Sequence, residues 1–171
     1  MPDVLYRSPY LSAVALGNAS SETQFTGAGS AVATCRVPLT TATLNRPMRI
    51  IAGGRVLAGA AMDFTARLYW GGSSTIASNT SITTAVTSCA ASTQQLWMID
   101  VTIGGTQTSA TDPGTISIVY VGTTGTAAAA LTTTDQGLPN ALISITGTFG
   151  SSNASNTAYL DWFEIQSVVG G

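Results

Sequence analysis

The stretch FTARLYW at residues 64–70 decides the fold class. Its first, third, fifth and seventh residues are apolar and fall on one face, whereas Thr65, Arg67 and Tyr69 fall on the other. This alternation is typical of a strand that packs one face on the core and turns the other outward. The two glycines at 71–72 favour a tight turn after it. The stretch therefore predicts a half-buried β-strand and not a helix.

The same alternation recurs along the chain. Further strands are expected at residues 31–37, 48–57, 97–103, 116–120 and 143–149. A last strand at 157–168 changes phase near Asp161 and Trp162, and a β-bulge there would reconcile its two halves. Helical spacing is nearly absent. We therefore predict an all-β fold, an antiparallel β-sandwich of about eight or nine strands.

Residues 1–20 precede this regular pattern. They include Tyr6 and Tyr10 among several apolar side chains, which makes them too apolar for a solvated tail. We interpret them as an extended N-terminal arm that lies on its own subunit or on a neighbour, and residues 21–171 as one β-sandwich domain. Deletion of residues 1–18 should then leave the sandwich folded. We also expect no membrane span and no secretory signal, since no stretch has the required apolar length and basic start.

The composition excludes many kinds of chemistry. The chain has 171 residues with a net charge of -2, and only 8% of its residues are charged, against roughly 25% in an ordinary soluble domain. Histidine is absent and all six basic residues are arginine. This rules out Ser-His-Asp and Cys-His catalysis, His-ligated zinc, Walker A phosphate loops and Schiff bases. Nor is there the basic footprint of a nucleic-acid binder. We therefore expect neither enzyme activity nor a cofactor.

The few charges are unevenly placed along the chain. Residues 1–67 hold six arginines and three acids, a net of +3, and residues 68–171 hold five acids and no base, a net of -5. In a sandwich the chain interleaves, so this asymmetry in sequence need not become one in space. Where it does, it favours head-to-tail or self-complementary contacts between copies.

The two cysteines, Cys35 and Cys89, allow two interpretations. They could form a disulfide if the fold brings their Cα atoms within about 7 Å. They could instead be two small buried side chains, as free cysteines commonly are. We favour the second interpretation.

Asp161 and Glu164 are the only close pair of acids. A glycosidase pair or a calcium site would need further ligands that converge on them, so we interpret both as outward-facing strand residues. Among the aromatic residues, Trp70 and Trp97 are expected in the core because they fall on apolar faces. Tyr69 and Trp162 fall on outward faces and are candidates for contact with a neighbour or a glycan.

Five segments carry a family resemblance. They are SET at 21–23, CRVP at 35–38, MRIIAGG at 48–54, ARLYWGG at 66–72 and SSNASNT at 151–157. In this order, over about residues 20–168, they resemble small virion proteins of tailed phages. The resemblance implies a jelly-roll module that serves as a capsid decoration (cement) protein or as a fibre or tail component. It brings no catalytic residues with it.

The sparse charge agrees with this resemblance, because a β-rich surface of Thr, Ser, Ala and Gly is easier to understand if neighbours cover it. We therefore predict a virion protein that binds the outer capsid surface as a homotrimer, contacts the major capsid protein and stabilises the head. Tyr6, Arg7 and Tyr10 of the arm are the expected inter-subunit contacts, with Tyr69 and Trp162 as further interface candidates. The alternative is a tail-fibre or receptor-binding module that recognises a glycan of the host surface.

Overall fold

The structure is a computed structural model that describes residues 3–7, 14–25, 34–37, 48–71, 78–104, 115–119, 124–127 and 141–167. Its elements are thirteen strands, and none of the described segments is a helix long and apolar enough to cross a membrane. The strands form two antiparallel sheets, which confirms the predicted all-β, sandwich-like fold.

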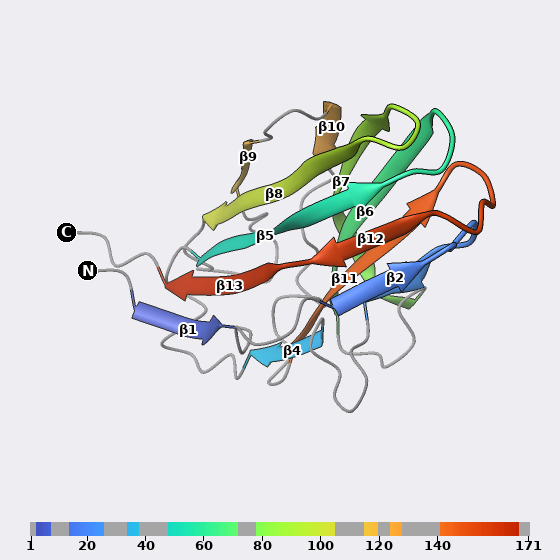
Figure 1. Cartoon of the computed structure of the whole chain (residues 1–171). Helices are drawn as coiled ribbons and strands as arrows, with labels where there is room; N and C mark the ends of the chain where they lie inside the picture. The colour runs from blue at the N-terminus through green and yellow to red at the C-terminus, as the bar shows by residue number, and fades with distance from the viewer. Residues whose placement is uncertain are drawn as a thin grey trace.

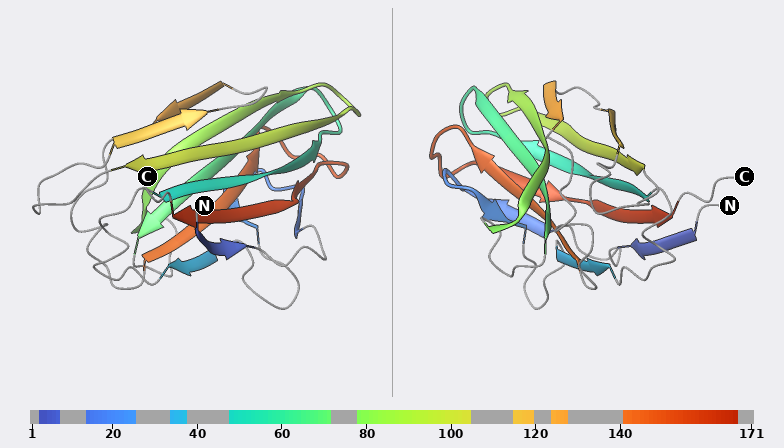
Figure 2. Two further views of the ribbon diagram at one scale, coloured as in Figure 1. Left: turned by 90° about the vertical axis from the view of Figure 1, so that its left-hand side faces the viewer. Right: turned by 180° about the vertical axis from the view of Figure 1, so that it is seen from behind.

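The large sheet has seven strands and the small sheet has six. The large sheet contains β1 (Asp3–Arg7), β2 (Val14–Gly17), β5 (Met48–Leu57), β8 (Gln94–Gly104), β9 (Thr115–Val119), β12 (Thr157–Leu160) and β13 (Trp162–Ser167). The small sheet contains β3 (Thr23–Gln24), β4 (Thr34–Val37), β6 (Met62–Gly71), β7 (Thr80–Cys89), β10 (Thr124–Ala127) and β11 (Ala141–Phe149). The large sheet lies in front of the small one in Figure 1, and Figure 2 shows both from the side and from behind.

The stretch at residues 64–70 lies in β6, which pairs with β7 on one side and β11 on the other. Its residues Phe64, Ala66 and Leu68 are fully buried, whereas Thr65 and the two outward residues after it are only half-buried. The alternation predicted for this strand is confirmed over these positions. The side chain of Trp70 lies outside the described residues.

The core lies between the two sheets. It is built from the inward residues of β5, β8 and β13 on one side and of β6 and β11 on the other. Trp97 of the large sheet is central: its ring stacks on Phe25 at 5.6 Å and lies 5.9 Å from Phe64 of the small sheet. Phe64 in turn contacts Phe149 at 5.1 Å. These aromatic contacts join the two sheets and confirm the predicted core position of Trp97.

The predicted β-bulge is present between β12 and β13. Ala158 pairs with Val56 and Trp162 pairs with Gly53, so the β12–β13 side has one residue more than β5. The extra residue shifts the alternation, which lets the apolar side chains on both sides of it face the core. The Asp161 N–H donates to the carbonyl oxygen of Gly53 at 2.9 Å.

The bulge brings the β12 backbone against β5. An ideal Cβ built on Gly54 would fall on the carbonyl oxygen of Tyr159, well inside contact distance. The same carbonyl accepts a hydrogen bond from the Trp97 indole N–H at 3.0 Å. Gly54 is therefore required by a close approach of two backbones, and Trp97 fixes that approach from the core.

Two described pieces of the predicted arm are strands of the large sheet. β1 pairs with β13, and β2 pairs with β12. Leu16 of β2 is buried in the core. At these positions the chain therefore lies on its own subunit as part of the sheet. The expectation that residues 1–18 are dispensable for folding does not fit these pairings.

The two cysteines lie far apart. Cys89 pairs with Met62 at one end of β6, while Cys35 pairs with Ile143, which pairs with Trp70 at the other end. Eight residues of strand separate these two ends, or about 27 Å. Cys89 is a free, buried thiol, and burial raises its pKa. The register thus excludes the disulfide that the sequence had left open.

Candidate functional site

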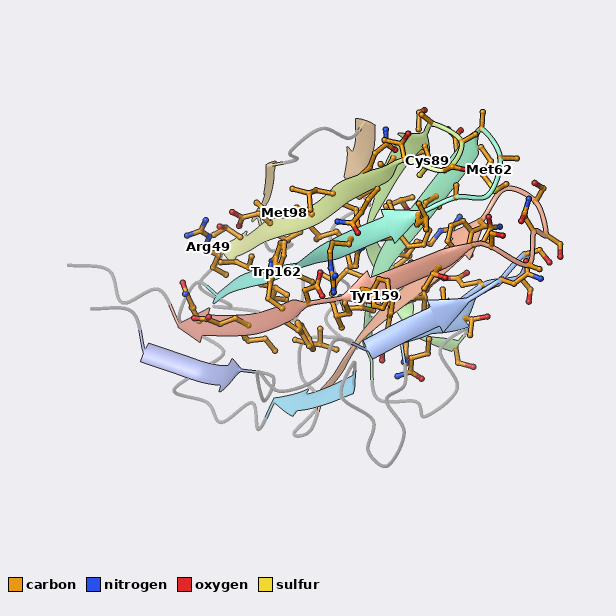
Figure 3. The ribbon with its side chains drawn as sticks, in the orientation of Figure 1. Arg49, Met62, Cys89, Met98, Tyr159 and Trp162 are labelled. Carbon is orange, nitrogen blue, oxygen red and sulfur yellow. The ribbon has the colours of Figure 1, made fainter. Side chains whose placement is uncertain are left out.

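The outer face of the large sheet is the most chemically varied surface of the described chain. Strand registers arrange its side chains in rows that run across β8, β5 and β13. From one end to the other, the rows are Leu96–Arg55, Met98–Gly53–Trp162, Asp100–Ile51–Glu164 and Thr102–Arg49–Gln166. We call this set the large-sheet outer face. Figure 3 labels Arg49 of β5, Met98 of β8 and Trp162 of β13 on this face, together with Tyr159 of the neighbouring strand β12.

Gly53 makes room for Trp162 at the centre of this face. An ideal Cβ on Gly53 would lie 2.5 Å from Cζ2 and 2.7 Å from Cε2 of the Trp162 indole. The ring therefore lies directly on the Gly53 backbone, where any larger residue would displace it. Trp162 is half-buried, because the sheet covers the side of the ring that rests on it. The result is an aromatic ring held against the sheet between Gly53 and solvent.

A bidentate ion pair lies on one side of this ring. Arg55 donates from Nε and Nη2 to the two carboxylate oxygens of Asp161, each at 2.8 Å. The guanidinium carbon also lies 4.7 Å above the ring centre of Tyr159. The hydrogen bonds that Arg55 donates to Asp161, followed by the negative charge of that carboxylate, raise the pKa of Arg55. The bulge positions this pair, since it turns the Asp161 side chain to the outer face.

Further paired polar groups lie on the other side of the ring. Arg49 donates from Nε to Asp100 at 2.8 Å and makes a second bond from Nη2 to the same carboxylate. The Asp100 side chain is only 8% exposed, so this pairing satisfies a nearly buried charge. Gln166 donates from Nε2 to Glu164 at 2.6 Å. The polar groups beside Trp162 are thus fixed in planar, hydrogen-bonded pairs.

In the folded chain, these ion pairs partly offset the uneven distribution of charge along the sequence. The pairs Arg49–Asp100 and Arg55–Asp161 each join an arginine of the first 67 residues to an acid from the later part. Interleaving of the strands therefore cancels charge locally over this face. A third pair, Arg67–Glu22 at 3.6 Å, lies on the small sheet.

The small-sheet outer face has a different character. We define it by the outward residues of β6, β7 and β11, which are Asp63, Thr65, Arg67, Tyr69, Ser81, Thr84, Val86, Ser88, Ser144, Thr146 and Thr148. Most of these carry hydroxyl groups. Glu22 lies over this face, where it accepts a hydrogen bond from Thr146 Oγ1 at 2.6 Å. Burial, followed by a hydrogen bond with Glu22, raises the pKa of Tyr69 to about 12.

The residues proposed from sequence as interface candidates do not form one cluster. Tyr69 and Trp162 lie on different sheets and on opposite outer faces. Tyr6 and Arg7 belong to β1, where they pair with Ile165 and Glu164, and their side chains lie outside the described residues. Tyr10 lies outside the described residues altogether. A single groove lined by both outward aromatics is therefore not formed.

The acid pair of the sequence is divided between two separate contacts. Asp161 is held by Arg55, whereas Glu164 is hydrogen-bonded to Gln166. In the described part of the chain, no three Cys, Asp or Glu side chains come together as a metal site would need. Sequence reasoning did not foresee the pairing of Arg55 with Asp161 or the role of Gly53. A glycine doublet inside a long strand was the one signal that could have drawn attention to both.

Comparison of the chain with protein-family models, with curated proteins and with solved structures found no significant match.

Proposed function

We propose that this chain is a structural protein of a tailed-phage virion, a jelly-roll-type module that binds the outside of the capsid and stabilises the head. We further propose that it binds as a homotrimer and contacts the major capsid protein. The resemblance of its ordered motifs supports this role. Two of those motifs lie in strands that follow one another along the chain, since residues 48–54 lie in β5 of the large sheet and residues 66–71 in β6 of the small sheet.

The observation that carries the proposal is the way the chain uses its few charges. The three arginines whose side chains are described, at positions 49, 55 and 67, all form ion pairs within the chain. Three acids of these faces are neutralised in this way, and Asp63 is exposed and accepts a hydrogen bond from Ser88. The faces therefore keep few charges that could hold neighbours apart. The small-sheet outer face in particular carries mainly hydroxyl side chains, of which those of Thr65, Thr84 and Ser88 are partly or fully exposed. Such a surface can be covered by another protein at a low cost in desolvated charge.

In the proposed mechanism, binding of this chain to the assembled capsid lattice stabilises that lattice. A module that binds the assembled lattice, and not free subunits, lowers the free energy of the assembled state alone. At a free concentration one hundred times the Kd, each occupied site contributes about 2.7 kcal/mol to the lattice. A trimer that contacts several subunits gains further from multivalency. No bond is made or broken in this role, which agrees with a chain that lacks histidine and lysine.

The proposal is tested on heads purified from a phage in which the gene for this chain has been deleted. Purified chain is added, the heads are sedimented, and bound chain is quantified. DNA release on heating is followed with a fluorescent dye. We expect saturable binding to heads, no binding to unassembled capsid subunits, and release of DNA at a higher temperature. Failure to sediment with the heads would contradict the proposal.

A further inference from the structure

The large-sheet outer face contains an aromatic ring that is fixed in place before any ligand binds. Trp162 lies on the backbone of Gly53, and Met98 is the residue paired with Gly53 on the other side. A ring seated in this way loses little conformational freedom when something stacks on its outer side. Large flat apolar groups of this kind bind the C–H faces of sugars as well as other rings.

Polar groups flank the ring at a distance set by the sheet. The rows before and after Trp162 are displaced by two residues along each strand, or about 7 Å. One of these rows contains Arg55, which holds Asp161, and the other contains Glu164. A small ring stacked on Trp162 therefore lies within reach of planar polar groups on both sides.

The Arg55–Asp161 pair keeps hydrogen-bonding capacity for a ligand. A guanidinium has five N–H donors, and Arg55 uses one on Nε and one on Nη2 toward Asp161. Each oxygen of Asp161 accepts one of these bonds and has a second lone pair. The side chain of Arg55 is 40% exposed and that of Asp161 is 19% exposed. Arg55 therefore presents a free N–H donor beside a free acceptor lone pair of Asp161. Two adjacent hydroxyl groups of a ligand can bind to such a pair, one as acceptor and one as donor.

We propose that the large-sheet outer face binds carbohydrate, with a sugar ring stacked on Trp162 and its hydroxyls bonded to Arg55 and Asp161. A neutral ligand fits best, because the arginines of this face are already paired with carboxylates and attract a phosphate or nucleic acid weakly. The inference goes beyond the proposed structural role and holds for a protein on the head or on the tail. Its test uses the isolated chain, so its failure is distinct from failure to bind capsids.

The experiment is a screen of the purified chain on an array of mono- and oligosaccharides, followed by calorimetric titration of the best-binding sugar. Trp162→Leu keeps an apolar cover over Gly53 but removes the aromatic face, and we expect it to weaken binding at least tenfold. Trp162→Phe should restore part of the affinity. Tyr69→Phe, on the opposite outer face, is the matched control and should bind like the unaltered chain. Thermal melting shows that each variant is folded.

Three outcomes would overturn the inference. The first is an array without any bound sugar. The second is equal sugar binding by Trp162→Leu and by Tyr69→Phe, which would place the site elsewhere. The third is concentration-dependent self-association in sedimentation that Trp162→Leu abolishes, since the face would then be covered by a second copy of the chain. Loss of sugar binding on Asp161→Asn, with unchanged melting, would further support the assignment.

Discussion

The two sheets have similar inner faces and different outer faces. Both turn large apolar side chains inward, and Trp97 of one sheet packs against Phe64 of the other. Outward, the large sheet presents Trp162 among paired charges, whereas the small sheet presents mainly hydroxyls. The inner residues therefore determine the fold, and the outward residues distinguish what each sheet can bind. The same difference extends to the described glycines, since an added Cβ would collide with neighbouring backbone at Gly53 and Gly54 but with side chains at Gly147.

The largest expected effect on stability comes from removal of two edge strands of the large sheet, β1 and β2. Deletion of residues 1–18 removes β1, β2 and the buried Leu16, so we expect the free energy of unfolding to fall by at least about 3 kcal/mol. Denaturation in urea measures it. Leu16→Ala alone should cost about 2 to 4 kcal/mol. A truncated chain that unfolds at the same urea concentration would show that these strands contribute little, as the sequence alone had suggested.

A second comparison uses one glycine from each sheet. Gly54→Ala places a methyl group on the Tyr159 carbonyl, which is backbone and cannot rotate away. We expect a loss of about 3 kcal/mol. Gly147→Ala in the small sheet meets ring atoms of Phe64 at 2.9 Å, which belong to a side chain and not to the backbone, and should cost less, about 2 kcal/mol. Thermal unfolding followed by circular dichroism ranks the two variants. The reverse order would mean that the bulge relaxes more easily than the core.

The ion pairs of the two faces should differ in a smaller way. Arg55 makes two bonds of 2.8 Å to Asp161 and packs over Tyr159, whereas Arg67 approaches Glu22 at only 3.6 Å. We expect Arg55→Met to lower the melting temperature measurably and Arg67→Met to leave it nearly unchanged. Raising the salt concentration should reduce that difference. Equal changes in melting temperature for Arg55→Met and Arg67→Met would show that the ion pairs of the two faces do not differ in strength.

The smallest effect concerns ionisation of Tyr69. Its pKa in the folded chain is about 12, above the ordinary value of 10.0, because burial and the hydrogen bond with Glu22 favour the neutral phenol. The stabilisation is therefore complete below pH 10 and is lost as the pH rises toward 12. Titration of phenolate absorbance should show one late component that Tyr69→Phe removes. A titration unchanged by this substitution would contradict the buried position of Tyr69.

The alternation of apolar and polar residues along the strands, and the position where it shifts by one residue, made much of the sandwich predictable from sequence. The period-two pattern of β6 identified its inward residues, and the change of phase near Asp161 identified the bulge. These signals are local, because a strand with one buried face must alternate whatever its partners are. β7 was not foreseen. Its inward residues Ala85, Thr87 and Cys89 are small, so no large apolar side chains mark its period.

Much of the candidate site could not be predicted, because it depends on long-range pairing. Arg55 and Asp161 are separated by 106 positions and meet only through the register of β5 with the bulged strand. Sequence placed Tyr69 and Trp162 on outward faces but gave no information about which sheet each strand joins. The two residues consequently lie on opposite sides of the molecule. The pairing of β1 with β13 was hidden for the same reason.

We propose that this chain is a component of a phage head whose surface is covered by neighbouring subunits. Cryo-electron microscopy of purified particles that contain it tests this most directly. We expect two-sheet densities of this shape in groups of three on the outer surface of the head, each group in contact with several capsid subunits. Density for the chain in the tail, or particles that lack the chain altogether, would contradict the account.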